Sequence, residues 1–185
     1  SFFESHKEMK PTGNIKLLAE SINSNTGFEG EGVFYPHFIE TMLKRWMIGV
    51  IAGVYGGKNN LYLILVGPQR SGKSEFFRRL LPEELKRFFS ESKLEQCKDA
   101  DLGMKMAEAL LMFDDEMSGK SGDDWKHIKN TLDKEVFHIR KPYAKGYIRI
   151  TRISSFCGTT NEEELLGDLT GNRRYIPIGT GEQLD

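Results

Sequence analysis

Residues 67–74 fit the phosphate-binding pattern G-x-x-x-x-G-K-[ST] and directly follow the apolar run 61–66. In such a loop the glycines let backbone amides face a β-phosphate, the lysine contacts the β- and γ-phosphates, and the serine hydroxyl contacts Mg²⁺. A helix that starts in the loop directs its positive end at the anion. The spacing therefore predicts an ATP and Mg²⁺ site rather than a glycine-rich turn without a ligand. The residues expected to bind nucleotide are Gly67, Pro68, Gln69, Arg70, Ser71, Gly72, Lys73, Ser74 and Glu75.

A second apolar run, residues 109–113, ends in the three acids Asp114, Asp115 and Glu116. In nucleotide hydrolases one such carboxylate holds Mg²⁺ and an adjacent acid orients or deprotonates the attacking water. Three consecutive acids leave the register open. An Asp-Glu pair after the strand selects Asp115 for the metal and Glu116 for the base, which we favour. A register one residue earlier selects Asp114 and Asp115, and a third interpretation has the acids only cap the next loop.

Three further polar residues are candidates for the same site. Asn161 ends a later strand, where its amide could hydrogen-bond the γ-phosphate or the water, although an ordinary turn asparagine would look the same. Arg173 and Arg174 could neutralise developing phosphate charge, or only solvate a surface turn. With Lys73 and Glu116, these three residues complete the predicted catalytic set.

The segment 136–161 is basic and contains no acid. We expect two strands, 136–143 and 146–156, joined by a tight turn. Cations beside Tyr143 and Tyr147 are typical of a surface that binds single-stranded nucleic acid, and the alternative is an ordinary solvated hairpin. The cations are Arg140, Lys141, Lys145, Arg149 and Arg152.

The remaining pattern alternates strands and helices, which predicts an α/β fold with a mostly parallel sheet covered on both faces. In such a sheet, ligands lie beyond the carboxyl ends of the strands, so the loop, the acids and Asn161 should converge. We expect an N-terminal extension over 1–35 and an ATPase domain over 36–185, with a leading helix within 36–57 and a core over 61–180. Helices are also expected at 101–108 and 123–134, and strands at 85–89 and 175–178.

Composition limits the class of protein. The chain has 185 residues, a net charge of −1 and 38% hydrophobic residues, as expected for one soluble domain. The two cysteines have no partners at metal-ligand spacing, which suggests a reducing cytoplasmic compartment. The apolar stretch 46–55 is too short to span a bilayer, and no signal peptide is expected. The first residue is Ser1 rather than Met, as in a piece of a longer chain.

Several of these stretches together resemble the virulence-associated protein E family, which contains P-loop ATPases of phages and other mobile elements and is similar to superfamily 3 helicases and the AAA+ class. They cover about residues 36–180 in the expected order. Gly-Thr-Thr-Asn and Thr-Gly-Asn-Arg-Arg are the most specific. The matching stretches are 65–74, 113–116, 140–143, 158–163 and 168–174.

The resemblance implies a three-layer αβα P-loop NTPase fold that is AAA+-like and is preceded by a helical N-terminal segment. It places Lys73 and Ser74 in Walker A, Asp115 and Glu116 in Walker B, and Asn161 at sensor 1. Arg173 or Arg174 would be an arginine finger, and the basic hairpin would grip single-stranded DNA inside a ring, expected to be a homo-hexamer. Relatives often carry a primase-like domain upstream.

These features predict the ATP-hydrolysing motor of a mobile-element DNA-replication helicase. Two other classes share the phosphate-binding loop. The first is a P-loop kinase, in which the basic segment 140–152 could serve as a mobile lid. The second is a nucleotide-binding scaffold, which would bind its ligand but barely hydrolyse it. Carboxylates followed by a strand-ending Asn favour a hydrolase over a kinase, whereas the scaffold stays compatible with an isolated domain.

Overall fold

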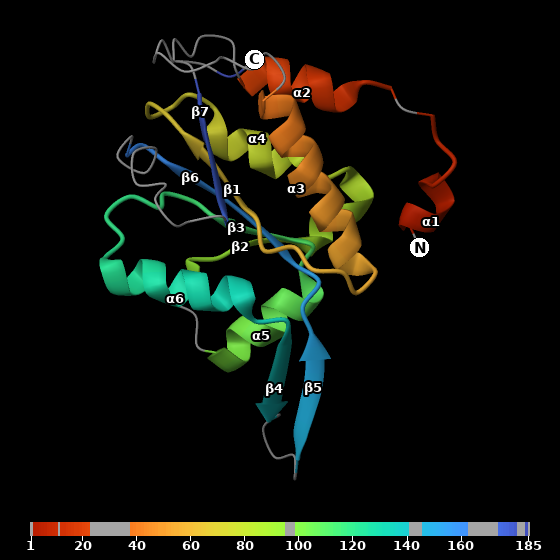
Figure 1. The fold of residues 1–185 in the computed structure, drawn as a ribbon, viewed down its shortest axis with the longest axis vertical. Helices are drawn as coiled ribbons and strands as arrows, with labels where there is room; N and C mark the ends of the chain where they lie inside the picture. Colours follow the sequence, from red (N-terminus) through yellow and green to blue (C-terminus); the bar gives the residue numbers. More distant parts are fainter. Residues whose placement is uncertain are drawn as a thin grey trace.

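The computed structural model describes residues 2–10, 12–22, 38–94, 99–140, 146–162, 174–180 and 184. Its centre is a five-stranded sheet in which every neighbouring pair is parallel, in the order β2-β3-β6-β1-β7 (Figure 1). The parallel arrangement aligns the carboxyl ends of all five strands along one edge. The strands are β1 (Tyr62–Val66), β2 (Phe89–Glu91), β3 (Leu111–Asp114), β6 (Ser155–Thr160) and β7 (Tyr175–Gly179).

Helices cover both faces of this sheet. Alternate residues of β1 point to opposite faces: Leu63 and Leu65 join one apolar cluster, and Tyr62 and Ile64 join the other. The first cluster includes residues of α2 (Asn14–Ile22), α3 (Phe38–Val54) and α4 (Lys73–Leu80); the second includes residues of α5 (Asp99–Glu108) and α6 (Gly122–Asp133). The predicted α/β class with a mostly parallel sheet between helical layers is confirmed.

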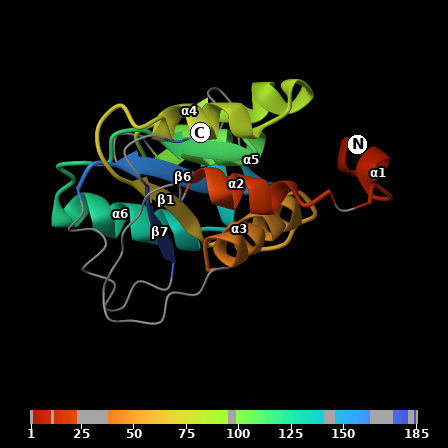
Figure 2. The ribbon, with the colours of Figure 1, turned by 90° about the horizontal axis from the view of Figure 1, so that it is seen from above.

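The periphery differs in places from the expected elements. Residues 85–89 are not a strand: a 3₁₀ helix, Glu83–Phe88, follows Pro82, and β2 starts only at Phe89. The amide of Leu85 donates to the carbonyl of Pro82, which closes a turn where we expected extended chain. The short helix α1 (Phe2–His6) lies outside the layers, as Figure 2 shows, and the Tyr55 hydroxyl donates to Glu4. The expected boundary at residue 35 lies outside the described residues.

The predicted strand 146–156 is two elements rather than one. β5 (Tyr147–Thr151) pairs antiparallel with β4 (Val136–Arg140), and β6 begins after a three-residue break. In that break the amides of Ile153 and Ser154 both donate hydrogen bonds to the carbonyl of Met106 in α5. These hydrogen bonds hold the chain against α5 where it passes from the hairpin to the main sheet. β4 and β5 therefore form a separate arm that projects from the body (Figure 1).

The predicted leading helix is α3, and one of its faces packs in the core. Leu43, Trp46 and Val50 are buried on one face of α3, and the Trp46 indole donates a hydrogen bond to the carbonyl of Phe156 at 3.0 Å. Trp46 therefore packs in the core, as expected. Within the described residues, no helix is long and apolar enough to cross a membrane.

Candidate active site

The glycine-rich loop follows the carboxyl end of β1 and leads into α4. Two of its positions require glycine: a Cβ at Gly67 would lie 2.2 Å from the Thr180 hydroxyl, and Gly72 has a φ of +91°. Gly72 caps α4 without a side-chain hydrogen bond. Amides of the first helical turn, which have no intrahelical partner, are therefore left for an anion.

The side chain of Lys73 folds back into this loop and is almost fully buried. Its Nζ donates to the carbonyl oxygens of Gly67 at 2.9 Å and Pro68 at 2.5 Å, and to the Ser71 hydroxyl at 3.2 Å. Burial lowers the pKa of Lys73 from its usual value, although the nearby Asp115 carboxylate opposes that shift. An ammonium held this way is a desolvated cation with a stronger pull on an incoming anion than an exposed lysine has.

The loop, Asp115, Glu116 and Asn161 share one open cavity of about 420 Å³ at the carboxyl edge of the sheet. This is the convergence that the strand-end pattern predicted. The loop residues Gly67 and Pro68 are not in its lining, and neither is Asp114. The lining residues are Gln69, Arg70, Ser71, Gly72, Lys73, Ser74, Glu75, Arg78, Asp115, Glu116, Thr159, Thr160 and Asn161.

The three consecutive acids point in different directions. Asp114 is the last residue of β3 and is completely buried in an ion pair with Lys120, whose Nζ lies 3.1 Å away. Asp115 accepts a hydrogen bond from the Ser74 hydroxyl at 2.7 Å, so it faces the glycine-rich loop. Of the two carboxylates predicted to bind metal, Asp115 contacts Ser74. Asp114 is still part of β3, and its side chain is buried against Lys120 instead.

Glu116 is exposed at the cavity wall and adopts a left-handed backbone with a φ of +62°. That conformation costs a residue with a Cβ about 1 kcal/mol or more, so it needs local support. The support comes from β6: the Glu116 amide donates to the Thr159 hydroxyl at 3.2 Å, and the Met117 amide donates to the Thr159 carbonyl at 2.8 Å. Asn161 follows β6, and its backbone amide donates a hydrogen bond to the Ser118 hydroxyl.

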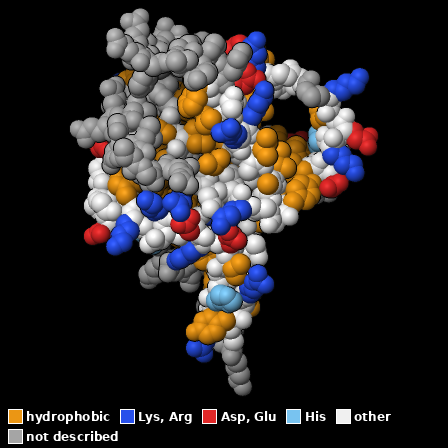
Figure 3. Space-filling view, in the orientation of Figure 1, with side chains coloured by type: hydrophobic (Ala, Val, Ile, Leu, Met, Phe, Trp, Pro, Cys, Tyr) orange, Lys and Arg blue, Asp and Glu red, His pale blue; other side chains and the backbone are white. Residues whose placement is uncertain are grey.

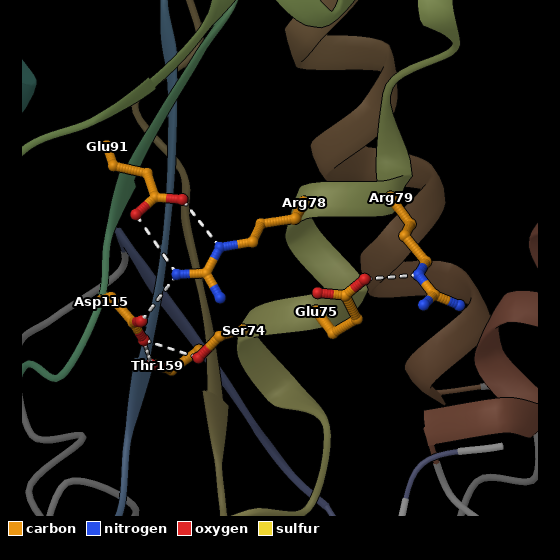
Figure 4. A network of polar contacts seen from close by, with 7 residues as sticks. All are labelled: Ser74, Glu75, Arg78, Arg79, Glu91, Asp115 and Thr159. Carbon is orange, nitrogen blue, oxygen red and sulfur yellow. Dashed lines mark hydrogen bonds and ion pairs between the residues drawn. The ribbon is translucent and has the colours of Figure 1, made fainter.

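Arg78 adds a cation beside these acids (Figure 4). Its guanidinium donates to Glu91 of β2 from Nε at 2.8 Å and to Asp115 at 3.3 Å. The hydrogen bond to Glu91 is the main reason why the pKa of Arg78 is raised. Because Arg78 lies one helical turn beyond Ser74, both side chains lie on the same face of α4 and reach the same aspartate.

The donor set at this position suits a magnesium ion. The Ser74 hydroxyl and the Asp115 carboxylate are oxygen groups of the kind that Mg²⁺ binds, and both lie against the start of α4. Two or three protein oxygens with open space beside them match an ion that keeps waters and phosphate oxygens as its other ligands. The residues present therefore fit Mg²⁺ together with a polyphosphate.

The basic hairpin lies at the opposite end of the sheet from this cavity. It leads into Ser155, the first residue of β6, whereas Asn161 follows the last, a separation of about 20 Å along the strand. The described strands of the hairpin, β4 and β5, therefore lie away from the cavity of their own chain, over which a kinase lid would close. Lys141 and Lys145 lie outside the described residues.

The two faces of the hairpin differ. Phe137 and Ile139 are buried against α5, where a Cβ at Gly103 would lie 2.8 Å from each side chain. The other face carries His138, Arg140, Tyr147 and Arg149, all exposed. Figure 3 shows basic, histidine and hydrophobic side chains together on the projecting arm.

Arg152 does not belong to that exposed face. It is 5% exposed and donates to the carbonyls of Leu132 and Asn59, at 2.8 and 2.6 Å. It therefore joins the base of the hairpin to the body and cannot contact DNA.

Arg174 lies at the start of β7, also far from the cavity. Its guanidinium donates to both carboxylate oxygens of Asp133 at the end of α6, at 2.9 and 2.7 Å. Its carbonyl accepts from the Tyr62 amide at 2.7 Å. The five residues of β7, about 16 Å of strand, separate Arg174 from the cavity edge, so Arg174 cannot reach the cavity of its own chain. Arg173 lies outside the described residues.

Comparison with known proteins agrees with the sequence motifs. A family model described as the virulence-associated protein E-like domain matches residues 31–185. The chain belongs to this family. No curated protein matches the chain.

Solved structures show that this VapE-like domain shares its fold with part of larger chains. One is titled "The A form apo structure of NrS-1 C terminal region-CTR": the TM-score is 0.58 at 15% identity, over 94% of this chain and 38% of that one. Another, of NrS-1 C-terminal residues 305–718, gives a TM-score of 0.53 at 14% identity, over 90% and 37%. The chain thus spans well under half of these neighbours.

Sequence reasoning missed three residues that line the cavity, namely Arg78, Thr159 and Thr160. Arg78 had a readable signal, because a residue four positions after the loop serine lies on the same helix face. Thr159 had none beyond its place in the Gly-Thr-Thr-Asn stretch, since its partners Asp115 and Glu116 lie in the loop after another strand, β3.

Proposed function

We propose that this VapE-like domain is the ATP-hydrolysing motor of a phage or mobile-element DNA-replication helicase, which couples Mg²⁺-dependent hydrolysis to engagement of single-stranded DNA. The observation that carries the proposal is the contact between Ser74 and Asp115 at 2.7 Å, at the head of a helix without a side-chain cap. Family membership and the exposed basic hairpin support the helicase part.

Five side chains of the cavity have a role in this proposal. The Lys73 ammonium binds β- and γ-phosphate oxygens, and the loop amides bind the β-phosphate. Ser74 and Asp115 hold Mg²⁺, which supplies charge neutralisation at the phosphates. Glu116 accepts a proton from the attacking water, and Asn161 orients that water or the γ-phosphate.

Efficient turnover in the proposal also needs a neighbouring subunit in a homo-oligomeric ring. The cavity lining contains no arginine beyond Arg70 of the loop and Arg78, among the described residues. Arg78 is already bonded to Glu91 and Asp115. A guanidinium aimed at the γ-phosphate would therefore come from another copy, by way of Arg173 or Arg174.

Two variants test the nucleotide site. Lys73→Ala should lose most ATP and ADP affinity because the buried cation is gone, whereas Lys86→Ala, an equal charge change on an exposed lysine, should not. Glu116→Gln should keep binding and lose about 100-fold or more of turnover, as expected for a general base. Calorimetry and phosphate release measure both effects. Unchanged affinity in Lys73→Ala would refute the site, and binding without turnover in the parent would favour a scaffold.

A further inference from the structure

Thr159 is buried at 3% exposure near the end of β6, between the two acids of the proposed active site. Its hydroxyl donates to Asp115 at 2.6 Å and accepts from the amide of Glu116 at 3.2 Å. A threonine hydroxyl has one proton to donate, and here that proton goes to Asp115. Figure 4 shows Thr159 reaching Asp115 beside Ser74.

The two hydrogen bonds act on different properties of the site. The bond to Asp115 fixes the carboxylate oxygen that also accepts from Ser74, and so sets the direction in which that oxygen meets a metal. The bond from the Glu116 amide holds the left-handed backbone that brings Glu116 to the cavity wall. A single hydroxyl thus joins the metal side of the site to the general-base side.

The neighbouring contacts extend the same connection between β6 and the loop after β3. The Met117 amide donates to the Thr159 carbonyl at 2.8 Å, and the Ser118 hydroxyl lies 3.2 Å from the Thr160 hydroxyl. Those contacts hold the loop but touch neither acid side chain. Among the described residues, the Thr159 hydroxyl is the side-chain group that hydrogen-bonds both to the Asp115 carboxylate and to the Glu116 backbone amide.

We infer that Thr159 is a positioning residue that orients the Asp115 carboxylate and the Glu116 backbone together, so that metal binding and base catalysis depend on one hydroxyl. The inference rests on the proposed function for its catalytic consequence. Its structural part does not, because both hydrogen bonds join residues of the chain itself. Thr159 itself is not assigned any contact with phosphate or water.

Three variants isolate the hydroxyl. Thr159→Val keeps the shape and removes both bonds, and Thr159→Ser keeps the hydroxyl. Thr131→Val is the matched control, because Thr131 is fully buried in α6 and its hydroxyl has no hydrogen-bond partner among the described residues. Should Thr159→Val fail to fold, Thr159→Ala offers the same comparison.

Amide hydrogen exchange is the first readout and needs neither metal nor nucleotide. In Thr159→Val the Glu116 amide should exchange about five- to tenfold faster, which corresponds to the net free energy of about one hydrogen bond. Thr159→Ser and Thr131→Val should retain the parent rate. Equal exchange at Glu116 in the Val variant and the parent would overturn the inference.

Metal binding is the second readout. With ADP present, Mn²⁺ affinity measured by electron paramagnetic resonance should fall about 10–100-fold in Thr159→Val, as for residues that orient metal ligands. The turnover number should fall while the KM for ATP changes little, and Thr159→Ser should restore both. Parent-like Mn²⁺ affinity in the Val variant would also overturn the inference. If the parent binds neither ADP nor Mn²⁺, the proposed function fails, and the exchange result alone decides the positioning role.

Discussion

At the scale of single residues, the neighbouring acids Asp114 and Asp115 have opposite environments. Asp114 is fully buried and paired with Lys120, of which only 5% of the side chain is exposed. Asp115 is partly exposed and accepts hydrogen bonds from Ser74 and Thr159. A buried charge pair matters mainly for folding, whereas a partly exposed carboxylate at a cavity can bind a cation.

Substitution of each acid by its amide should therefore separate stability from metal binding. Asp114→Asn should lower the free energy of unfolding by about 3 kcal/mol, because the nearly buried Lys120 ammonium loses its ion pair with the fully buried Asp114 carboxylate. It should leave the Mg²⁺ requirement of turnover unchanged. Asp115→Asn should fold with nearly the parent stability and require far more Mg²⁺. Urea unfolding and Mg²⁺ titrations measure both effects; the reverse pattern would favour the earlier register of the acids.

At the scale of elements, the hairpin of β4 and β5 is built as an arm with one anchored face and one exposed face. Phe137 and Ile139 pack on α5, and the buried Arg152 joins the base of the arm to the end of α6 and to the segment before β1 through the carbonyls of Leu132 and Asn59. Cations on the opposite face cannot reach the chain's own cavity. The arm is therefore suited to a separate partner.

Removing one exposed cation from the arm tests single-stranded DNA as that partner. Arg149→Ala should weaken DNA binding and reduce the slope of log K against log salt by about 0.7, the value for one lost phosphate contact on a single strand. ATP affinity should not change. Lys16→Ala is the control, because it removes the same charge from α2, at the far end of the molecule (Figure 1). Fluorescence anisotropy at several salt concentrations measures the slope, and equal slopes for both variants would exclude the arm as the DNA site.

At the scale of the whole molecule, the cavity lies at the carboxyl ends of the parallel strands, and Arg174 lies at the opposite, amino end of β7. Strand β7 connects them without bringing the guanidinium toward the cavity, and Asp133 holds Arg174 within its own chain. This pair is partly exposed, so it contributes at most about 1 kcal/mol to stability. A neighbouring subunit could recruit Arg174 at small cost.

A mixed assembly should show whether arginines act between subunits. Lys73→Ala lacks a working phosphate site, and the double variant Arg173→Ala/Arg174→Ala lacks the finger. Each should be inactive alone, and mixing should restore part of the turnover, since such a finger is worth about 10³–10⁵ in rate. Parent activity should also rise with protein concentration.

Asp133→Asn supplies the matched control for Arg174. It breaks the same ion pair but keeps the arginine, so a purely structural role predicts equal losses of turnover in Asp133→Asn and Arg174→Ala. A role between subunits predicts a loss only in Arg174→Ala. In the mixing experiment, no recovery of turnover in rings shown to contain both variants would mean that the arginines do not act in trans.

The sequence by itself determined the features that depend on local spacing. Gly67, Gly72, Lys73 and Ser74 form their loop because residues within one strand–loop–helix unit interact at short range. Continuous apolar runs also predicted the buried parallel strands, because both faces of such a sheet are covered. Gathering the loop, the acids and Asn161 at one edge followed from parallel strand direction alone.

Only the tertiary structure decided which side chain meets which partner. Asp114 and Asp115 look equivalent as a sequence, but consecutive residues at a strand end point to opposite faces, and the partners Lys120, Ser74 and Thr159 come from other elements. Arg152 and Arg149 look like equal members of one basic run, yet one is buried beneath backbone carbonyls and the other is exposed. Those differences depend on contacts between residues far apart in the chain, which local spacing does not specify.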